Sequence, residues 1–206
     1  VARRGGPLFL STGMTTLEEI DRAVATILPR NSKLIINHCV SVYPTPSEDL
    51  NLGAVMTLRN RYAPIPIGYS GHEIGYFPTI AAVALGACTV ERHFTLDKSL
   101  PGPDHATVSL EPHEFADMVK RIRIVEKAVA DNKIYLHEKE IAHRNKHGKS
   151  VATREHIPAG TAITAEMLTC KSPGYGIRPY LIHTVIGRRA KIDIPEDTTI
   201  TEEFLA

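Results

Sequence analysis

The fold is constrained most strongly by an alternation between short apolar runs and helix-like stretches, which extends from residue 7 to about residue 131. The apolar runs lack the polar alternation of a half-exposed strand, as is typical of strands buried on both faces of a sheet. They begin at residues 7, 33, 65 and 88, and the intervals of 26, 32 and 23 residues leave room for a crossover helix between parallel strands. The pattern therefore predicts an α/β fold with a parallel sheet. The expected strands are 7–10, 33–37, 65–69 and 88–92.

Helices are predicted between these strands from the spacing of the apolar residues. In the stretch 15–28 such residues recur at helical intervals, and Thr15 with Glu18 is expected to form a capping box. The stretch 112–130 repeats the pattern, whereas 47–62 is a weaker helix candidate and 77–87 is a compact one with small residues. The apolar stripe of the first helix comprises Leu17, Ile20, Val24, Ile27 and Leu28.

Polar residues follow each predicted strand, at the point where the strand ends. Ligands of parallel α/β folds bind at the carboxyl ends of the strands, so these side chains are expected to converge on one rim. The opposite connections hold ordinary turn residues. The rim is therefore the predicted active site. Its candidate residues are Ser11, Thr12, His38, Ser41, Tyr43, Ser70, His72, Glu91, His93 and Asp104.

Two of the rim residues, His72 and His93, follow neighbouring strands and have carboxylates nearby. Neutral imidazoles with carboxylate partners suit a divalent metal ion, and two protein ligands would leave positions open for water and substrate. The alternative is that each histidine is a hydrogen-bonded structural residue, as His38 could equally be. The segment "PGPDH" could likewise be a tight turn in which Asp104 caps a backbone group.

Charge and composition exclude several classes of function. The formal net charge is +1 and the basic residues are scattered, which argues against binding to nucleic acid or to an anionic membrane. No apolar run approaches the ~20 residues that span a bilayer, and no signal-peptide pattern opens the sequence. We therefore expect a soluble, cytoplasmic protein. Cys39, Cys88 and Cys170 lack the spacing of a zinc site and are predicted to be reduced, buried thiols.

Several motifs together resemble the sialic acid synthase family. The combination of S-x-H, E-R-H-F-T and P-G-P-D-H is the most specific part, and the resemblance spans essentially the whole chain. The motifs are "LSTGMTTLEEID", "HCVSVYPTPSEDLNL", "IGYSGHEIG", "ERHFT", "PGPDH" and "GKSVATREHIPAG".

The resemblance implies a fold and a reaction. Members of this family have a (β/α) TIM-type barrel followed by a small antifreeze-like (SAF) domain. They are transferases that form a carbon–carbon bond between phosphoenolpyruvate and N-acetylmannosamine, its 6-phosphate or a related amino sugar. Water is consumed, and the products are phosphate and an N-acetylneuraminate-type nonulosonic acid. The reaction uses a divalent metal ion, Mn²⁺ or Mg²⁺.

The resemblance also implies roles for residues of the rim. His72 and His93 match the metal ligands, and Glu91 and Asp104 match acidic residues of the catalytic pocket. Two residues depart from the family pattern. One is on the rim, where Ser41 stands in the place of a longer Asn that many bacterial members carry, and the other is Ser172 in the C-terminal part. The residues that match substrate contacts are Ser11, Ser70 and Tyr43, with Ser41 as a further candidate.

The C-terminal part changes character. Residues 132–148 are polar and predict a linker, and 149–206 show short strands broken by Pro-Gly turns that resemble the SAF domain. In the family this domain closes over the active site of the partner subunit, which implies a domain-swapped homodimer. An arginine of the family motif reaches the sugar, but here Ser172 occupies its place in "KSPGYG". Arg178 or Lys171 is the expected substitute.

The sequence supplies only part of a barrel. Four strands are predicted where the family has eight, and Arg92 and Lys98 are the nearest candidates for a phosphate clamp. We therefore expect the second half of the barrel, with little activity unless the other half is supplied or two half-barrels pair. Two alternatives remain: a carbohydrate-binding or scaffolding module without catalysis, and a metal-dependent aldolase that acts on pyruvate. An imine mechanism is disfavoured, because no lysine stands at a predicted strand end.

Overall fold

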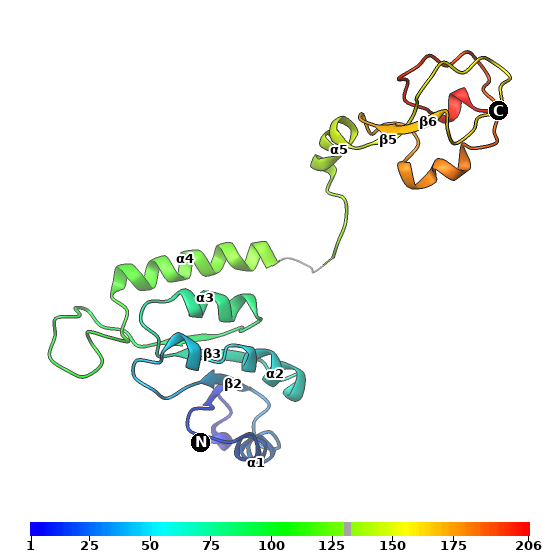
Figure 1. Cartoon of the computed structure of the whole chain (residues 1–206). Helices are drawn as coiled ribbons and strands as arrows, with labels where there is room; N and C mark the ends of the chain where they lie inside the picture. Colours follow the sequence, from blue (N-terminus) through cyan, green and yellow to red (C-terminus); the bar gives the residue numbers. More distant parts are fainter. Residues whose placement is uncertain (130–132) are drawn as a thin grey trace. The chain divides into compact units, whose positions relative to one another are not determined.

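The computed structural model describes residues 1–129 and 133–206 (Figure 1). The chain divides into two compact units, Val1–Asn132 and Lys133–Ala206. The linker boundary that the sequence placed at residues 131 and 132 lies outside the described residues. Among the residues that are described, no helix has both the length and the apolar character needed to cross a bilayer.

The first unit contains a four-stranded sheet in the order β1-β2-β3-β4, and every neighbouring pair is parallel. A helix follows each strand, so the βα unit occurs four times, which is half of an eight-stranded (β/α) barrel. This confirms the predicted architecture. The strands are β1 (Leu8–Ser11), β2 (Leu34–Cys39), β3 (Ile67–Gly71) and β4 (Val90–Arg92). The helices are α1 (Leu17–Ile27), α2 (Gly53–Tyr62), α3 (Phe77–Ala84) and α4 (Pro112–Val129), with 3-10 turns η1 (Ala2–Arg4) and η2 (Ser47–Asp49).

One face of the sheet packs against the helices. Ile36 and Tyr69 on the strands contact a core that includes Val24 of α1 and Val55 of α2, and all four side chains are buried. Helix α4 lies alongside α3 (Figure 1) and adds Met118 and Ile122 to a second cluster beside β4. The hydrophobic burial that stabilises this unit therefore lies between the sheet and its helical layer.

The other face of the sheet is open along the edge strands, which corrects the prediction of burial on both faces for β1 and β4. The central strands β2 and β3 are buried almost throughout, as predicted. Phe9 in β1 is 54% exposed, and Ser11 and Glu91 on the edge strands are exposed as well. The physical reason is that the four described strands do not close into a barrel, so β1 and β4 each lack a neighbouring strand on one side. The functional residues of the rim lie along the carboxyl ends of this open face.

Helix α1 begins one residue later than the sequence pattern suggested. The capping box predicted for Thr15 and Glu18 is wrong, because Thr16 accepts from the backbone N–H of Glu19, whose carboxylate accepts from the N–H of Thr16. Thr15 instead donates its hydroxyl to the carbonyl of Thr12. Within the predicted stripe Ile20 and Val24 are buried, whereas Leu17 and Leu28 at the two ends are exposed.

The cysteines differ in burial. All three are free thiols, as predicted, but only Cys39 is buried. Cys88 is exposed, because it precedes β4 at the amino end of the sheet and its side chain lies on the surface; Cys170 on β6 is half-buried. The prediction of burial is therefore wrong for Cys88.

The second unit has its own core and few regular elements. Strands β5 (Ser150–Thr153) and β6 (Leu168–Lys171) pair antiparallel, and isolated bridges such as Ile157 with Ile194 connect the remaining extended segments. The predicted linker contains two helical elements, η3 (Glu138–Glu140) and α5 (Ile141–His147). The polar sequence did not indicate them, because a short exposed helix has no apolar stripe. The later helical elements of the second unit are η4 (Pro179–Thr184) and η5 (Glu202–Phe204).

Candidate active site

Two imidazoles lie side by side at the carboxyl ends of β3 and β4. His72 follows β3 directly and His93 follows β4 directly, and their ring centroids are 5.2 Å apart with the planes at 77°. Tyr43, from the loop after β2, packs against both rings at centroid distances of 4.1 Å and 5.6 Å. The parallel register thus brings three residues from three loops into one cluster. We call His72 and His93 the imidazole pair.

His72 is held in a defined orientation. Its side chain is 5% exposed, and its Nδ1 lies 2.8 Å from the carbonyl oxygen of Val40. A carbonyl oxygen only accepts, so the ring must carry its proton on Nδ1, and in the neutral form Nε2 then keeps its lone pair. This is the arrangement that metal-bound histidines usually show.

His93 is half-exposed and lies close to a carboxylate. Its Nδ1 is 3.9 Å from Oδ2 of Asp104, which belongs to the long loop between β4 and α4. Partial burial lowers the pKa of His93, the neighbouring His72 lowers it further, and the charge of Asp104 opposes both effects. The neutral imidazole, which is the form that binds metals, is therefore favoured.

We expect the titration of His93 by NMR to show a pKa below the ordinary value of about 6.5. His72→Asn should raise that pKa by removing a positive neighbour, and Asp104→Asn should lower it further by removing a negative one. Because folding favours the neutral ring, the stability that this group contributes is present above about pH 6.5 and is lost as the pH falls through the lowered pKa. A pKa above 6.5 in the folded protein would contradict the described surroundings of the ring.

Ser70 and Glu91 form a second polar pair one residue inside the rim. They face each other across β3 and β4, and the Ser70 hydroxyl donates to Oε1 of Glu91 at 3.0 Å. Ser70 is buried, whereas Glu91 is exposed on the open face of the sheet. The carboxylate is thus anchored at one oxygen, and its other oxygen can accept a further hydrogen bond from a substrate or from water.

The loops after β1 and β2 pack closely at the same rim. A Cβ on Gly13 would lie 2.1 Å from the Ser41 hydroxyl oxygen, so any larger residue would require Ser41 to change its rotamer. The Thr12 hydroxyl accepts from the backbone N–H of Cys39 at 3.1 Å. Burial is the main reason why the pKa of Tyr43 is raised, so its phenol remains protonated.

The sequence did not single out Cys39 as part of the site. Its Sγ lies 4.0 Å from Nδ1 of His72 and 3.8 Å from the hydroxyl oxygen of Ser41. The only signal in the sequence is its place in "HCVS", directly after a strand that ends on the rim. A buried thiol in contact with an imidazole is part of the polar surroundings of His72.

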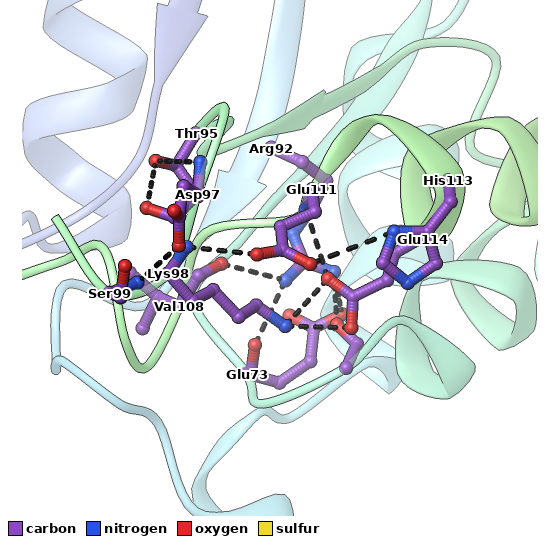
Figure 2. Close-up of polar contacts among 11 residues, drawn as sticks. Glu73, Arg92, Thr95, Asp97, Lys98, Ser99, Val108, Glu111, His113 and Glu114 are labelled. Atoms are coloured by element: carbon purple, nitrogen blue, oxygen red, sulfur yellow. Dashed lines mark hydrogen bonds and ion pairs between the residues drawn. The ribbon is translucent and has the colours of Figure 1, made fainter.

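Neither basic residue that the sequence suggested as a phosphate clamp is available for that role. Arg92 has a fully buried side chain and pairs with Glu73 at 2.9 Å. Lys98 pairs with Glu114, Nζ to Oε2 at 2.6 Å, and its backbone N–H donates to Glu111 (Figure 2). Both cations are neutralised by carboxylates of this unit, which corrects the expectation.

Three further candidates are Ser11, His38 and Arg178. Ser11 ends β1, opposite Asn37, and is exposed on the open face. His38 is buried, with Nε2 2.9 Å from the Leu50 carbonyl oxygen, which is the structural role that the sequence left open. Arg178 belongs to the second unit, where it precedes η4.

The imidazole pair fits a divalent ion as two nitrogen donors. Nitrogens bound at ~2.0 to 2.1 Å from one ion place their ring centroids roughly 4.5 to 6 Å apart, and the observed separation is 5.2 Å. Within the described ranges no three His, Cys, Asp or Glu side chains gather into a metal site. A bound ion would therefore take its remaining ligands from water or substrate oxygens.

Comparison with known proteins identifies the family of this chain. The profile of the NeuB family matches residues 1–134, and that of the SAF domain matches residues 148–206. The chain belongs to the NeuB family. The resemblance seen in the motifs is therefore confirmed, and so is the combination of a partial barrel with an SAF domain.

The chain is 40% identical to human N-acetylneuraminate-9-phosphate synthase over 99% of its length, which is 57% of that protein. It is 36% identical to N,N'-diacetyllegionaminic acid synthase of Legionella pneumophila, over 97% of this chain and 57% of the relative. The crystal structure of N-acetylneuraminic acid synthetase from Leptospira borgpetersenii, in complex with citrate, superposes with a TM-score of 0.64 at 37% identity. That match covers 70% of this chain and 51% of the other. The chain thus spans little more than half the length of these relatives.

Proposed function

We propose that this chain provides the metal-binding rim of a nonulosonic acid synthase, which condenses phosphoenolpyruvate with an amino sugar and water. The observation that carries the proposal is the imidazole pair, 5.2 Å apart at the carboxyl ends of two parallel strands, in a chain of the NeuB family. The carboxylates of Glu91 and Asp104 are on the same rim. The products would be phosphate and an N-acetylneuraminate-type sugar acid.

The metal, Mn²⁺ or Mg²⁺, would act as a Lewis acid that polarises the aldehyde of the open-chain sugar. The protein's own part is to orient the ring of His72 and to favour the neutral form of His93. The Val40 carbonyl fixes His72, and partial burial lowers the pKa of His93. Both features keep nitrogen lone pairs available for the ion.

The carboxylates of Glu91 and Asp104 are proposed to orient the attacking water molecule and to accept its proton. In the reaction C3 of the enol phosphate attacks the aldehyde, water adds to C2, and phosphate leaves by cleavage of its C–O bond. Glu91, anchored by Ser70 and exposed on the open face, can orient the water or accept its proton. Asp104, at 3.9 Å from His93, is the second candidate for this role. Ser11, Ser41, Tyr43 and Ser70 are the proposed substrate contacts.

A role in substrate binding is also proposed for the second unit. Lys171 is paired with Asp197 at 2.5 Å, and Ser172 donates to the His147 carbonyl at 3.3 Å. Arg178 is therefore the cation that we propose for contact with the sugar. In a domain-swapped homodimer this arginine would reach the site of the partner subunit.

The reaction can be tested with phosphoenolpyruvate that carries ¹⁸O in its bridging position. We expect the label to appear in inorganic phosphate, and sugar-acid formation to fall at least about 100-fold when a chelator removes the metal. The assay would use the chain alone and together with the N-terminal part of the human relative, with N-acetylmannosamine, its 6-phosphate and diacetamido sugars as acceptors.

The alternatives give different results in the same assay. A carbohydrate-binding or scaffolding module would bind the amino sugar saturably without releasing phosphate under either condition. A metal-dependent aldolase would turn over pyruvate and ignore its enol phosphate. Either outcome with the complemented chain would contradict the proposed synthase activity.

A further inference from the structure

The guanidinium of Arg92 connects three segments of the first unit. Nη1 donates to Oε1 of Glu73 at 2.9 Å, to the hydroxyl of Thr79 at 2.9 Å and to the carbonyl of Gly75 at 2.7 Å. Nη2 donates to the carbonyl of Glu73 at 2.9 Å and to that of Val108 at 3.3 Å. These partners belong to the loop after β3, to α3 and to the loop after β4. Figure 2 shows two of them, Glu73 and Val108, beside Arg92.

Nε of Arg92 is buried without a hydrogen-bond partner among the described residues, whereas the carboxylate of Glu73 accepts from several groups. Besides Arg92 it accepts from the Tyr69 hydroxyl at 2.9 Å and from the Thr79 hydroxyl at 2.6 Å. The side chains of Glu73 and Arg92 are 3% and 0% exposed. A Cβ on Gly71 would lie 2.3 Å from Oε2 of Glu73, so the backbone of β3 also makes room for this carboxylate.

The ion pair lies directly behind the imidazole pair. Glu73 follows His72 in the chain, and Arg92 precedes His93. Arg92 ends β4 and His93 follows it, so their side chains point to opposite faces of the sheet. The hydrogen bond from Thr79 of α3 places the carboxylate of Glu73 on the helical side as well. A movement of either charged residue is therefore passed to the adjacent histidine through one peptide unit.

Stability alone does not account for such a pair. Two buried charges lose their hydration, and apolar residues of similar size often stabilise a fold as well or better. The pair instead fixes the position of the loop after β3 relative to the loop after β4, because the five donor contacts of Arg92 can form together only in that arrangement.

We propose that Glu73 and Arg92 are positioning residues that fix the separation and orientation of the imidazole pair. This inference deepens the proposed function, because it concerns the same metal-binding rim. Neither residue touches the substrate or the metal in this account. They act through His72 and His93.

The test has a readout that needs neither metal nor activity. The ring ¹⁵N and ¹H shifts of His72 and His93 are recorded by NMR in the metal-free chain carrying Thr79→Val or Glu73→Gln. Thr79→Val replaces a hydroxyl with a methyl group and changes no charge, so the fold is expected to survive even if Glu73→Gln proves too disruptive. The matched control is Glu126→Gln, which breaks an exposed Glu–Arg pair on α4 with a distance of 2.8 Å.

The proposal predicts that both ring signals shift in Thr79→Val and in any folded Glu73→Gln protein, and that they stay in place in the control. It further predicts that Mn²⁺, measured by electron paramagnetic resonance, binds about 10- to 100-fold more weakly to these variants. Unmoved ring signals in a folded Thr79→Val protein would overturn the positioning role. Failure of the wild-type chain to bind Mn²⁺ would instead count against the proposed metal site, and the ring signals would still decide the positioning role.

Discussion

His72→Ala is expected to raise the dissociation constant for Mn²⁺ at least about 100-fold. The imidazole pair supplies both nitrogen donors, and loss of an outer partner of a metal ligand already costs about 10- to 100-fold in affinity. Removing the ligand itself should reduce the affinity for Mn²⁺ by at least as much, because the other donors to the ion are expected to be water or substrate oxygens. Free Mn²⁺ can be counted by electron paramagnetic resonance while the chain is titrated.

The matched control is His113→Ala, which removes an imidazole that is 76% exposed and 3.6 Å from Glu111. This histidine lies in the first turn of α4 and is paired with Glu111 rather than with the imidazole pair, so the affinity should not change. If His72→Ala binds Mn²⁺ as tightly as the wild type, or if both variants lose affinity equally, the rim is not the metal site.

Glu73→Ala is expected to lower the free energy of unfolding of the first unit by about 3 to 5 kcal/mol. The change leaves the guanidinium of Arg92 buried without its carboxylate, and removing one partner of a buried ion pair has an effect of this size. It also leaves the hydroxyls of Tyr69 and Thr79 without their acceptor. Urea unfolding followed by circular dichroism measures the change.

The control for this prediction is Glu126→Ala, which removes an exposed carboxylate from a pair with Arg123. Exposed ion pairs contribute little to the free energy of unfolding, so the unfolding curve of Glu126→Ala should overlay that of the wild type. The double variant Glu73→Met with Arg92→Met should recover much of the lost stability, because it leaves no unpaired buried charge. A Glu73→Ala midpoint equal to that of Glu126→Ala would show that the buried pair is not coupled to folding.

The strands and their order could be predicted from the sequence because each depends on a local pattern. The run that begins at residue 33 became β2, Leu34–Cys39, and the runs beginning at 7 and 65 shifted by only one or two residues. The start of α1 was placed one residue too early, because Thr15 and Thr16 are equally good caps by residue type. Only the backbone angles at Thr16 distinguish them.

The topology of the sheet was enough to predict which residues lie at the rim, but not which side chains they pair with. Parallel strands bring the residues after β3 and β4 together whatever their identity, so the neighbourhood of His72 and His93 could be inferred. The pairing of Lys98 with Glu114 joins a loop to a helix, and no local pattern records it. The burial of Arg92 was missed for the same reason. The sequence did contain one signal, because Glu73 is next to His72 and Arg92 is next to His93, so two opposite charges stand at the ends of neighbouring strands.

The account depends on one ion shared by two imidazoles. Crystals of the chain soaked in Mn²⁺ and measured at the manganese absorption edge give the most direct test. We predict one anomalous peak at the rim, roughly 2.0 to 2.3 Å from a ring nitrogen of both His72 and His93. A peak bound to only one of these rings, or the absence of any peak between them while Mn²⁺ binds elsewhere on the chain, would contradict the account.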